Sequence, residues 1–445
     1  MGFIQGEARG QQTLFPVTLD DLVPSDHVCR VIEAFVGKLD MAKLGFERAE
    51  PAETGRPGYD PRDLLKLYLY LYGYLQQVRS SRRLEAECQR NVEVMWLLGR
   101  LTPDYKSIAE FRRMHREAVT KAGAELVRFA RAVGLVRGEW IALDGSKFHA
   151  VSSAKSVRER DAIKRYLEQL ERADEQDEVI IDPSAVAAAL EKLKKHAEPE
   201  ARFMRMGFHD HAPAYNVQTA VDAEHALIVA QKVTTEGNDQ RCLLPMAEAA
   251  KQAVGAPETT NVVADAGYSN GEQVEGCEQQ GIVPHVPAHR ANNNKGDGTL
   301  FDRSQFHYDP QTDTFRCPAG QMLVRIQLSR RDRCVMYAAP SQVCGACSMK
   351  ARCTTGSRRW TTRHLHDDAL KRMQQRVTPA HMRLRRSTVE HPFATLKYRI
   401  FGHPRFLLRG VGGAQTEISL ATMVYNLKRM MNVLGGRKFI AELAC

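Results

Sequence analysis

The sequence predicts an α/β protein in which an N-terminal all-helical domain precedes a mixed sheet and a cysteine-bearing segment. Three observations predict this class. Apolar residues recur at helical spacing through the first 135 residues, whereas short apolar runs alternate with helical segments from 137 to 287. Five cysteines then fall between residues 317 and 353, in a loop-like stretch. Alternating strands and helices are typical of a mixed sheet covered by helices.

Composition and charge indicate a globular protein with a polyanionic partner. The 445 residues are 43% hydrophobic, which is ample for buried cores, and the net charge of +10 favours such a partner. No run approaches the roughly 20 apolar residues of a membrane-spanning helix, and the N-terminus lacks a signal-peptide pattern. We therefore expect a cytoplasmic protein with no membrane partner, whose ten cysteines are reduced thiols or metal ligands.

The first domain, residues 1–136, carries several helix-start signals. Asp60-Pro61, Ser80-Ser81 and the capping box Ser107-Ile-Ala-Glu110 each precede an apolar helical pattern. Basic residues cluster near the last two starts, namely Arg79, Arg82, Arg83, Arg112, Arg113 and Arg116, of which Arg82, Arg83, Arg112 and Arg113 are the candidate DNA contacts. A helix-turn-helix-like domain would place such arginines on DNA phosphates, and a solvated basic face is the alternative.

Two aspartates are predicted at the ends of strands in residues 137–287. An apolar run ends in Asp144-Gly145, and a second run ends in Asp265. Between them we expect a helical insertion at about 150–210 and a β-hairpin over 215–233. Residues at strand ends commonly face the ligand in α/β sheets, although an aspartate before glycine also begins an ordinary turn.

A third carboxylate, Glu390, lies in a basic stretch near the C-terminus. If this stretch is helical throughout, Arg386, Glu390 and Lys397 project from one face. The alternative is that Ser387-x-x-Glu390 is a capping box that opens an ordinary helix. Together with the two aspartates, Glu390 would make an oxygen-ligand site for two Mg²⁺ or Mn²⁺ ions, which can activate a water or a 3′-hydroxyl on a phosphodiester.

Four cysteines in residues 288–378 could hold a structural zinc ion, namely Cys317, Cys344, Cys347 and Cys353. Four thiols suffice for a tetrahedral site, which leaves Cys334 spare. Their spacing is not that of a standard paired-knuckle ribbon. Reduced thiols that pack a small domain are therefore the alternative.

From about residue 15 to 435 the chain resembles bacterial insertion-sequence transposases of the DDE type, in the IS-four superfamily and its IS-eleven-eighty-two-like group. The segments that carry the resemblance include Gly55-Arg-Pro-Gly-Tyr-Asp-Pro61, Leu143-Asp-Gly145, Tyr215-Asn-Val-Gln218, Ala264-Asp-Ala-Gly-Tyr268 and Val389-Glu-His-Pro-Phe393. The resemblance implies an RNase H-like core formed by residues 137–287 and 379–435, with a tail at 436–445. It also implies that Asp144, Asp265 and Glu390 form the metal-binding triad.

The family's Tyr-x2-Arg-x3-Glu-x6-Lys signature maps onto Arg386, Glu390 and Lys397. Arg383 stands at the tyrosine position, where another cation would still favour DNA phosphate. The resemblance thus implies that Arg386 and Lys397 fix the DNA backbone.

These observations lead to the hypothesis of a DNA transposase. It would bind terminal inverted repeats, cleave phosphodiester bonds by two-metal hydrolysis and join 3′ ends to target DNA. We expect it to act as a homodimer on double-stranded DNA, in association with the nucleoid. The alternatives are an RNase H-like nuclease without strand transfer and a non-catalytic DNA-binding regulator derived from a transposase.

Overall fold

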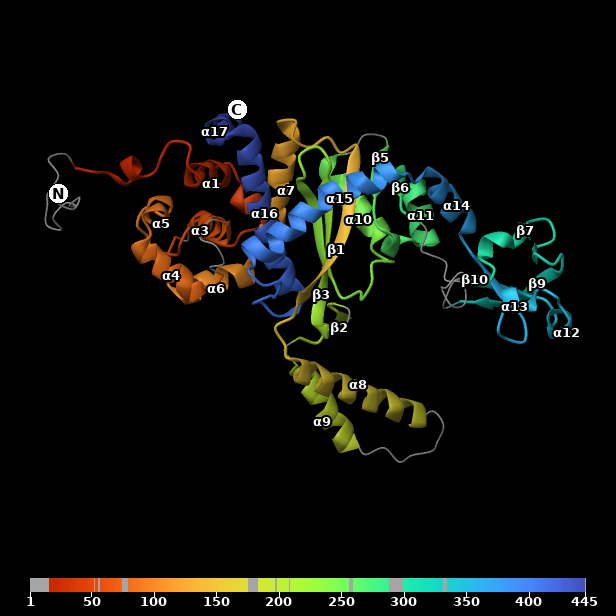
Figure 1. Ribbon diagram of the computed structural model, residues 1–445. Coiled ribbons are helices and arrows are strands. Elements are labelled where there is room, and N and C mark those ends of the chain that lie inside the picture. Colours follow the sequence, from red (N-terminus) through yellow and green to blue (C-terminus); the bar gives the residue numbers. More distant parts are fainter. Residues whose placement is uncertain are drawn as a thin grey trace, which may run out of the picture. The chain divides into compact units, whose positions relative to one another are not determined.

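The computed structural model describes most of the chain (Figure 1), namely residues 16–51, 53–54, 57–73, 79–174, 183–196, 198–207, 209–255, 259–287, 299–330 and 334–444. The chain forms two compact units, and both are discontinuous in sequence. Unit 1 contains Met1–Arg137, Ser146–Gly237 and Glu390–Cys445, and unit 2 contains Gly138–Gly145 and Asn238–Val389.

Unit 1 begins with a helical region, as the apolar spacing predicts. After a short 3₁₀ turn its helices are α1 (Val28–Gly37), α2 (Met41–Leu44), α3 (Pro61–Gly73), α4 (Ser81–Arg90), α5 (Val92–Leu97), α6 (Tyr105–Met114) and α7 (Arg116–Ala132). Helices α3 and α4 begin at the predicted signals. The box predicted at Ser107 is wrong, because the side chain of Asp104 accepts hydrogen bonds from the N–H groups of Lys106 and Ser107 and therefore starts α6 earlier.

A long C-terminal helix completes the core of this helical region. Helix α16 (Gly410–Leu434) is buried along most of its length and packs against α3 and α7. Helix α17 (Gly436–Ala444) packs against α1. Residues 436–444, predicted as a tail, are thus helical, and the fully buried ring of Phe439 stacks on Phe129.

The first sheet is mixed, as predicted. It contains β1 (Trp140–His149), β2 (Arg202–Arg205), β3 (His211–Asp222), β4 (Ile228–Thr234), β5 (Thr260–Val263) and β6 (Ile282–His285). The strands pair in the order β2-β3-β1-β5-β6, and β4 pairs with β3. The pairs β1/β5 and β5/β6 are parallel, whereas β2/β3 and β3/β4 are antiparallel. The pair β3/β4 is the predicted hairpin.

The predicted helical insertion is present between β1 and β2 (Figure 1). It consists of α8 (Ala154–Asp174) and α9 (Pro183–Lys194), which pack against each other. In unit 2, α10 (Leu243–Val254) precedes β5, and α11 (Gly271–Gln279) connects β5 to β6. This strand and helix alternation follows the order that the sequence predicts.

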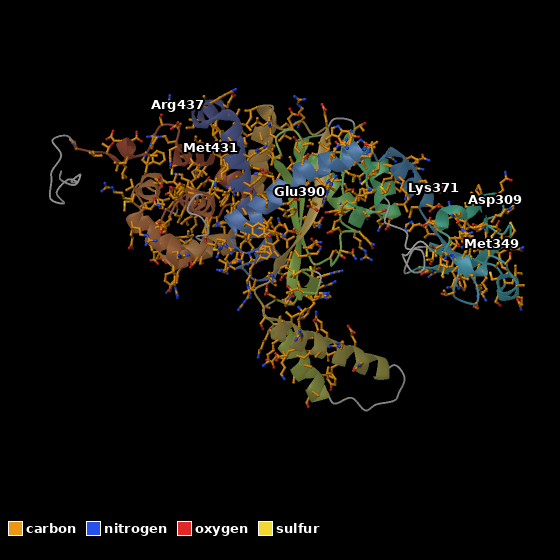
Figure 2. The ribbon with its side chains drawn as sticks, in the orientation of Figure 1. Asp309, Met349, Lys371, Glu390, Met431 and Arg437 are labelled. Carbon is orange, nitrogen blue, oxygen red and sulfur yellow. The ribbon has the colours of Figure 1, made fainter. Side chains whose placement is uncertain are left out.

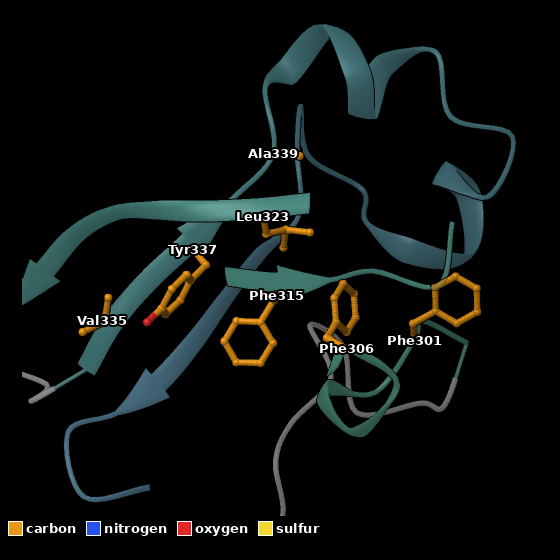
Figure 3. Packing of buried hydrophobic residues seen from close by; sticks show 7 residues of the cluster. All are labelled: Phe301, Phe306, Phe315, Leu323, Val335, Tyr337 and Ala339. Atoms are coloured by element: carbon orange, nitrogen blue, oxygen red, sulfur yellow. The ribbon is translucent and has the colours of Figure 1, made fainter. Parts of the chain in front are cut away.

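The cysteine-bearing segment of unit 2 contains a second, antiparallel sheet. Its order is β11-β10-β9-β8-β7, formed by β7 (His307–Asp309), β8 (Thr314–Arg316), β9 (Met322–Ser329), β10 (Cys334–Ala338) and β11 (Trp360–His364). Short helices α12 (Ser341–Gly345) and α13 (Lys350–Cys353) lie between β10 and β11. Figure 3 shows its small core of Phe301, Phe306, Phe315, Leu323, Val335, Tyr337 and Ala339.

Two helices follow the second sheet. Helix α14 (Asp367–Arg376) is succeeded by α15 (Pro379–Ala394), which begins in unit 2 and ends in unit 1. A π-helix, η4 (Thr395–Ile400), continues directly from α15. In the part of the chain that the structure describes, no helix has the length and apolarity that a membrane crossing requires.

Candidate active site

The two predicted aspartates lie together at one edge of the first sheet. Asp144 is in β1 and Asp265 directly follows β5, which runs parallel to β1 as its neighbour. The parallel register of β1 with β5 ends at the pair Ala142 and Val263, and each aspartate is the second residue after its strand's member of that pair, so this topology brings the two side chains together. Asp265 follows the end of β5, as the sequence predicts. Asp144 is the fifth residue of β1, which continues to His149, so the prediction that Asp144 ends a strand is wrong.

The turn after β5 fixes the carboxylate of Asp265. Its Oδ1 atom accepts a hydrogen bond of 2.8 Å from the N–H of Gly267. A Cβ atom on Gly267 would lie only 2.9 Å from the same Oδ1. The turn therefore requires glycine at this position, because a side chain there would push the carboxylate out of place.

A third residue, Arg385 of α15, contacts both aspartates. Its Nη2 atom lies 2.6 Å from Oδ1 of Asp144 and 3.4 Å from Oδ2 of Asp265. The side chains of Arg385 and Asp144 are 16% and 21% exposed, so their contact is mostly shielded from water. The side chain of Asp265 is 46% exposed. One guanidinium thus contacts both aspartates and offsets one of their two negative charges.

Arg385 was not predicted from the sequence, and the helical phase explains why. The known signature points to Arg386, which is exposed together with Glu390, one turn later. Arg385 shares its face with Val389, which is fully buried. The spacing of Arg385 to an apolar residue four positions on was a usable signal that this arginine faces inward.

The electrostatics of Asp144 are set mainly by burial. Burial raises the pKa of Asp144 to about 6, the Arg385 guanidinium lowers it, and the charge of Asp265 raises it again. The N–H of Gly145 donates a hydrogen bond of 3.0 Å to Oδ1 of Asp144 and also lowers the pKa. The charge of a further carboxylate, Asp239, also raises the pKa of Asp144.

Asp239 was not identified from the sequence. It lies shortly before α10 and close to Gly267, since its Oδ2 would be 3.8 Å from a Cβ built there. Its backbone carbonyl accepts a hydrogen bond from the N–H of Cys242. Asn238-Asp239 before a helix is typical of an ordinary helix start, so nothing local in the sequence distinguishes this carboxylate.

Glu390 lies on α15, five residues after Arg385, and its side chain is exposed (Figure 2). The helix begins at Pro379, and the hydroxyl of Ser387 donates to the carbonyl of Leu384. The alternative of a capping box at Ser387 is therefore wrong. Glu390 belongs to unit 1 and the two aspartates to unit 2, and their grouping as a triad stays a prediction.

The basic residues of the predicted signature differ in their surroundings. Arg383 and Arg386 are exposed on α15. Lys397 lies in the π-helix, with its Nζ 5.8 Å from the centre of the Phe148 ring. The expectation of one common face assumed an uninterrupted α-helix, and i→i+5 bonding after Ala394 changes the helical phase. Arg386 and Glu390 are both exposed and lie four residues apart on α15, and their common face with Lys397 stays a prediction.

The donor set at the sheet edge suits a hard cation, although a guanidinium now lies there. Asp144 and Asp265 offer carboxylate oxygens, which are the ligands that Mg²⁺ and Mn²⁺ prefer. Across the described residues, no three His, Cys, Asp or Glu side chains are arranged to hold a metal ion. At the aspartate pair, Arg385 contacts both carboxylates.

The four cysteines predicted as zinc ligands line one cavity of about 30 Å³ in unit 2, and they are Cys317, Cys344, Cys347 and Cys353. Burial raises the pKa of the Cys353 thiol, and the other three thiols raise it further, apart from an opposing effect of Arg359. Cys334 lies in β10 and is not among the lining residues. The structure brings the predicted thiols together but does not arrange them as metal ligands.

One of the four arginines predicted to contact DNA is buried. Arg112 is 6% exposed, donates a hydrogen bond of 3.4 Å to the carbonyl of Arg79, and lies over the ring of Tyr68. Its side chain is thus enclosed near Tyr68 of α3 and Glu417 of α16 and is not presented to solvent, as a contact with DNA would require. The remaining three, Arg82, Arg83 and Arg113, are exposed.

Two family models match the chain. The model described as Transposase domain (DUF772) matches residues 17–114, and the model described as Transposase DDE domain matches residues 173–427. The second match includes Asp265 and Glu390 and begins after Asp144. No curated protein matches the chain. Because the second model covers more than half of the sequence, the chain belongs to the insertion-sequence transposases of the DDE type, whose DDE domain implies an RNase H-like fold.

Proposed function

We propose that the protein binds the terminal inverted repeats of its own element, cleaves them by two-metal hydrolysis and joins the 3′ ends to target DNA. The observation that carries the proposal is the pair of aspartates at the edge of the first sheet, held by one guanidinium. The two matched models support placing it in the IS-four superfamily and its IS-eleven-eighty-two-like group. Its place of action would be the nucleoid, as a homodimer on double-stranded DNA.

Each candidate residue has a distinct role in this proposal. Asp144 and Asp265 would share the metal ions, and Glu390 would complete the second site. When bound, Mg²⁺ or Mn²⁺ supplies a polarised water or 3′-hydroxyl and stabilises the leaving oxygen. Arg383 and Arg386, exposed on the helix that carries Glu390, would bind backbone phosphates, together with Lys397.

An assay with duplex element ends tests the proposal. Full-length protein with Mg²⁺ should nick the end duplex and produce molecules in which the freed 3′ end is joined to target DNA. Nicked ends without joined products would instead indicate a nuclease. Binding of the end without cleavage in Mg²⁺ or Mn²⁺ would indicate a DNA-binding regulator.

The helical region is the proposed reader of the element ends, because a metal-bound acid cluster acts on the backbone and cannot choose a sequence. We predict that replacing Arg82, Arg83 and Arg113 with glutamine in the full-length protein weakens binding to end and unrelated duplexes alike. The log–log salt dependence should flatten by roughly 0.9 for each phosphate that the protein no longer neutralises. The full chain is required because α16 and α17 complete the core of this region.

The matched control for this experiment is Arg128→Gln. Arg128 is an exposed arginine of α7 that pairs with Glu125 at 2.6 Å. The control should keep the wild-type salt slope. If the triple variant also keeps that slope, the three arginines form a solvated face and end recognition lies elsewhere in the chain.

For the cysteine segment we propose an insertion that binds one structural zinc ion through Cys317, Cys344, Cys347 and Cys353. This requires the thiols to turn into the cavity that they line. We predict about one equivalent of zinc in protein purified without chelator, and its loss in Cys347→Ser but not in Cys334→Ser. Elemental analysis measures this. Zinc well below one equivalent, with thermal stability unmoved by a strong chelator, would show that these cysteines only pack the segment.

A further inference from the structure

Arg385 occupies the space between the two aspartates that the proposed function assigns to metal binding. A single nitrogen, Nη2, contacts a carboxylate oxygen of each, at 2.6 Å for Asp144 and 3.4 Å for Asp265. A positive charge that offsets one of the two carboxylate charges is thus already present in the chain. It is carried by a side chain that can leave, because α15 holds Arg385 through a long flexible stem.

Burial strengthens the interaction between the Arg385 guanidinium and the Asp144 carboxylate. Arg385 is 16% exposed and Asp144 21% exposed, so their interaction is screened less than that of a surface pair. Without a cation between them, the two neighbouring carboxylates, of which only Asp144 is mostly shielded, would repel each other. A divalent ion bound to the same oxygens would remove that repulsion as well. The ion and the guanidinium therefore cannot both take this position.

One hydrogen-bond donor of Arg385 is not used in its contacts with the two aspartates. Its Nε is buried and has no hydrogen-bond partner among the described residues, although a guanidinium can use this donor in a bidentate contact. Arg383 and Arg386 are exposed on the same helix and present positive charge beside it. A phosphate on this surface would offer Arg385 the paired acceptors that two separate carboxylates do not.

We propose that Arg385 is a displaceable internal cation, which holds Asp144 and Asp265 in a metal-free resting state and moves to a DNA phosphate when metal binds. Metal and DNA then favour each other, because each removes an obstacle to binding of the other. Arg385 acts here as a positioning residue. The inference rests on the proposed assignment of the two aspartates as metal ligands.

Binding of Mn²⁺ to the full-length protein without DNA tests the first half of the inference. Arg385→Gln should bind Mn²⁺ about tenfold more tightly than wild type, measured by calorimetry or by electron paramagnetic resonance of free Mn²⁺. Arg386→Gln, which removes the neighbouring exposed charge, should change the affinity by less than about threefold. Equal or weaker binding by Arg385→Gln would overturn the inference, since a competitor must strengthen binding when it is removed.

Two further variants keep the test decisive. Arg385→Lys retains one charge without the planar fork and should bind Mn²⁺ with intermediate affinity, so it replaces Arg385→Gln if that variant does not fold. Asp144→Asn should lose most of the binding. If Asp144→Asn binds as wild type does, the metal assignment itself fails, whereas a loss there combined with unchanged Arg385 variants defeats only the role of Arg385.

The second half is tested with a duplex whose scissile linkages are replaced by non-cleavable ones. In wild type, this duplex should raise the Mn²⁺ affinity about tenfold, because a phosphate takes the guanidinium away from the aspartates. In Arg385→Gln the increase should be reduced to less than about threefold. An equal increase in both proteins would show that the coupling between DNA and metal does not pass through Arg385.

Discussion

Replacing Asp144 or Asp265 with asparagine, or Glu390 with glutamine, is expected to reduce Mg²⁺-dependent end cleavage by at least about 10³-fold. Each change removes a charge proposed to bind metal and alters little volume, so folding and end binding should persist. A quantitative cleavage assay alongside a binding assay on the same duplex measures both properties. The loss should appear in the chemical step and not in the affinity for DNA.

A matched control for this set is Asp309→Asn in the exposed strand β7 of the second sheet (Figure 2). It makes the same chemical change far from the candidate residues in sequence and should leave cleavage within about twofold. Any one of the three variants that keeps cleavage within about tenfold of wild type would remove that residue from the triad. Asp239→Asn belongs in the same series, because its charge acts on Asp144.

Alanine at Arg79 or Arg112 is expected to destabilise unit 1 by about 3–5 kcal/mol, because either change leaves a buried carboxylate short of a partner. That carboxylate is Glu417 of α16, which is 0% exposed and lies 3.3 Å from Nη1 of Arg79. Burial raises the pKa of Glu417, whereas the guanidinium of Arg112, the N–H groups of Leu407 and Leu408 and the charge of Arg79 oppose this. Urea unfolding followed by circular dichroism measures the loss.

Arg113→Ala is the matched control for Arg112→Ala. The two arginines are adjacent on α6, but Arg113 is exposed and pairs with Glu110 at 3.5 Å, so its loss should cost less than about 1 kcal/mol. Glu417→Gln added to Arg79→Ala should recover part of the stability, because it removes the uncompensated charge. If Arg112→Ala unfolds no more easily than Arg113→Ala, Arg112 does not support the core in this way.

The success of the sequence analysis at the aspartates has a physical basis. Asp144 and Asp265 follow short apolar runs, and parallel pairing of β1 with β5, which ends at Ala142 and Val263, is enough to bring the two aspartates together. This combines a local pattern with a general rule of topology. The mixed sheet, the β3/β4 hairpin and the α8/α9 pair were predictable for the same reason, since each is encoded in a continuous stretch.

The failures at Arg112 and Arg385 arise from contacts between distant parts of the chain. Whether Arg112 faces solvent depends on a glutamate more than 300 positions later, and the partner of Arg385 lies 241 positions earlier. The spacing of neighbouring residues in the sequence gives no information about either of these distant partners. The change of helical phase after Ala394 was missed for another reason, because helix patterns assume one period, and Pro392 is the only sign that hydrogen bonding is interrupted within α15.

Because α16 packs against α3 and α7, the core of the helical region can be completed only late in synthesis. The ribosome adds about 5–20 residues per second, so roughly 15–60 s pass between synthesis of the end of α7 and synthesis of the start of α16. During that interval the apolar faces of the first helices lack the element that buries them. A nascent or prematurely terminated chain that lacks α16 leaves these faces uncovered, and we expect the proposed DNA binding of this region to require the finished polypeptide.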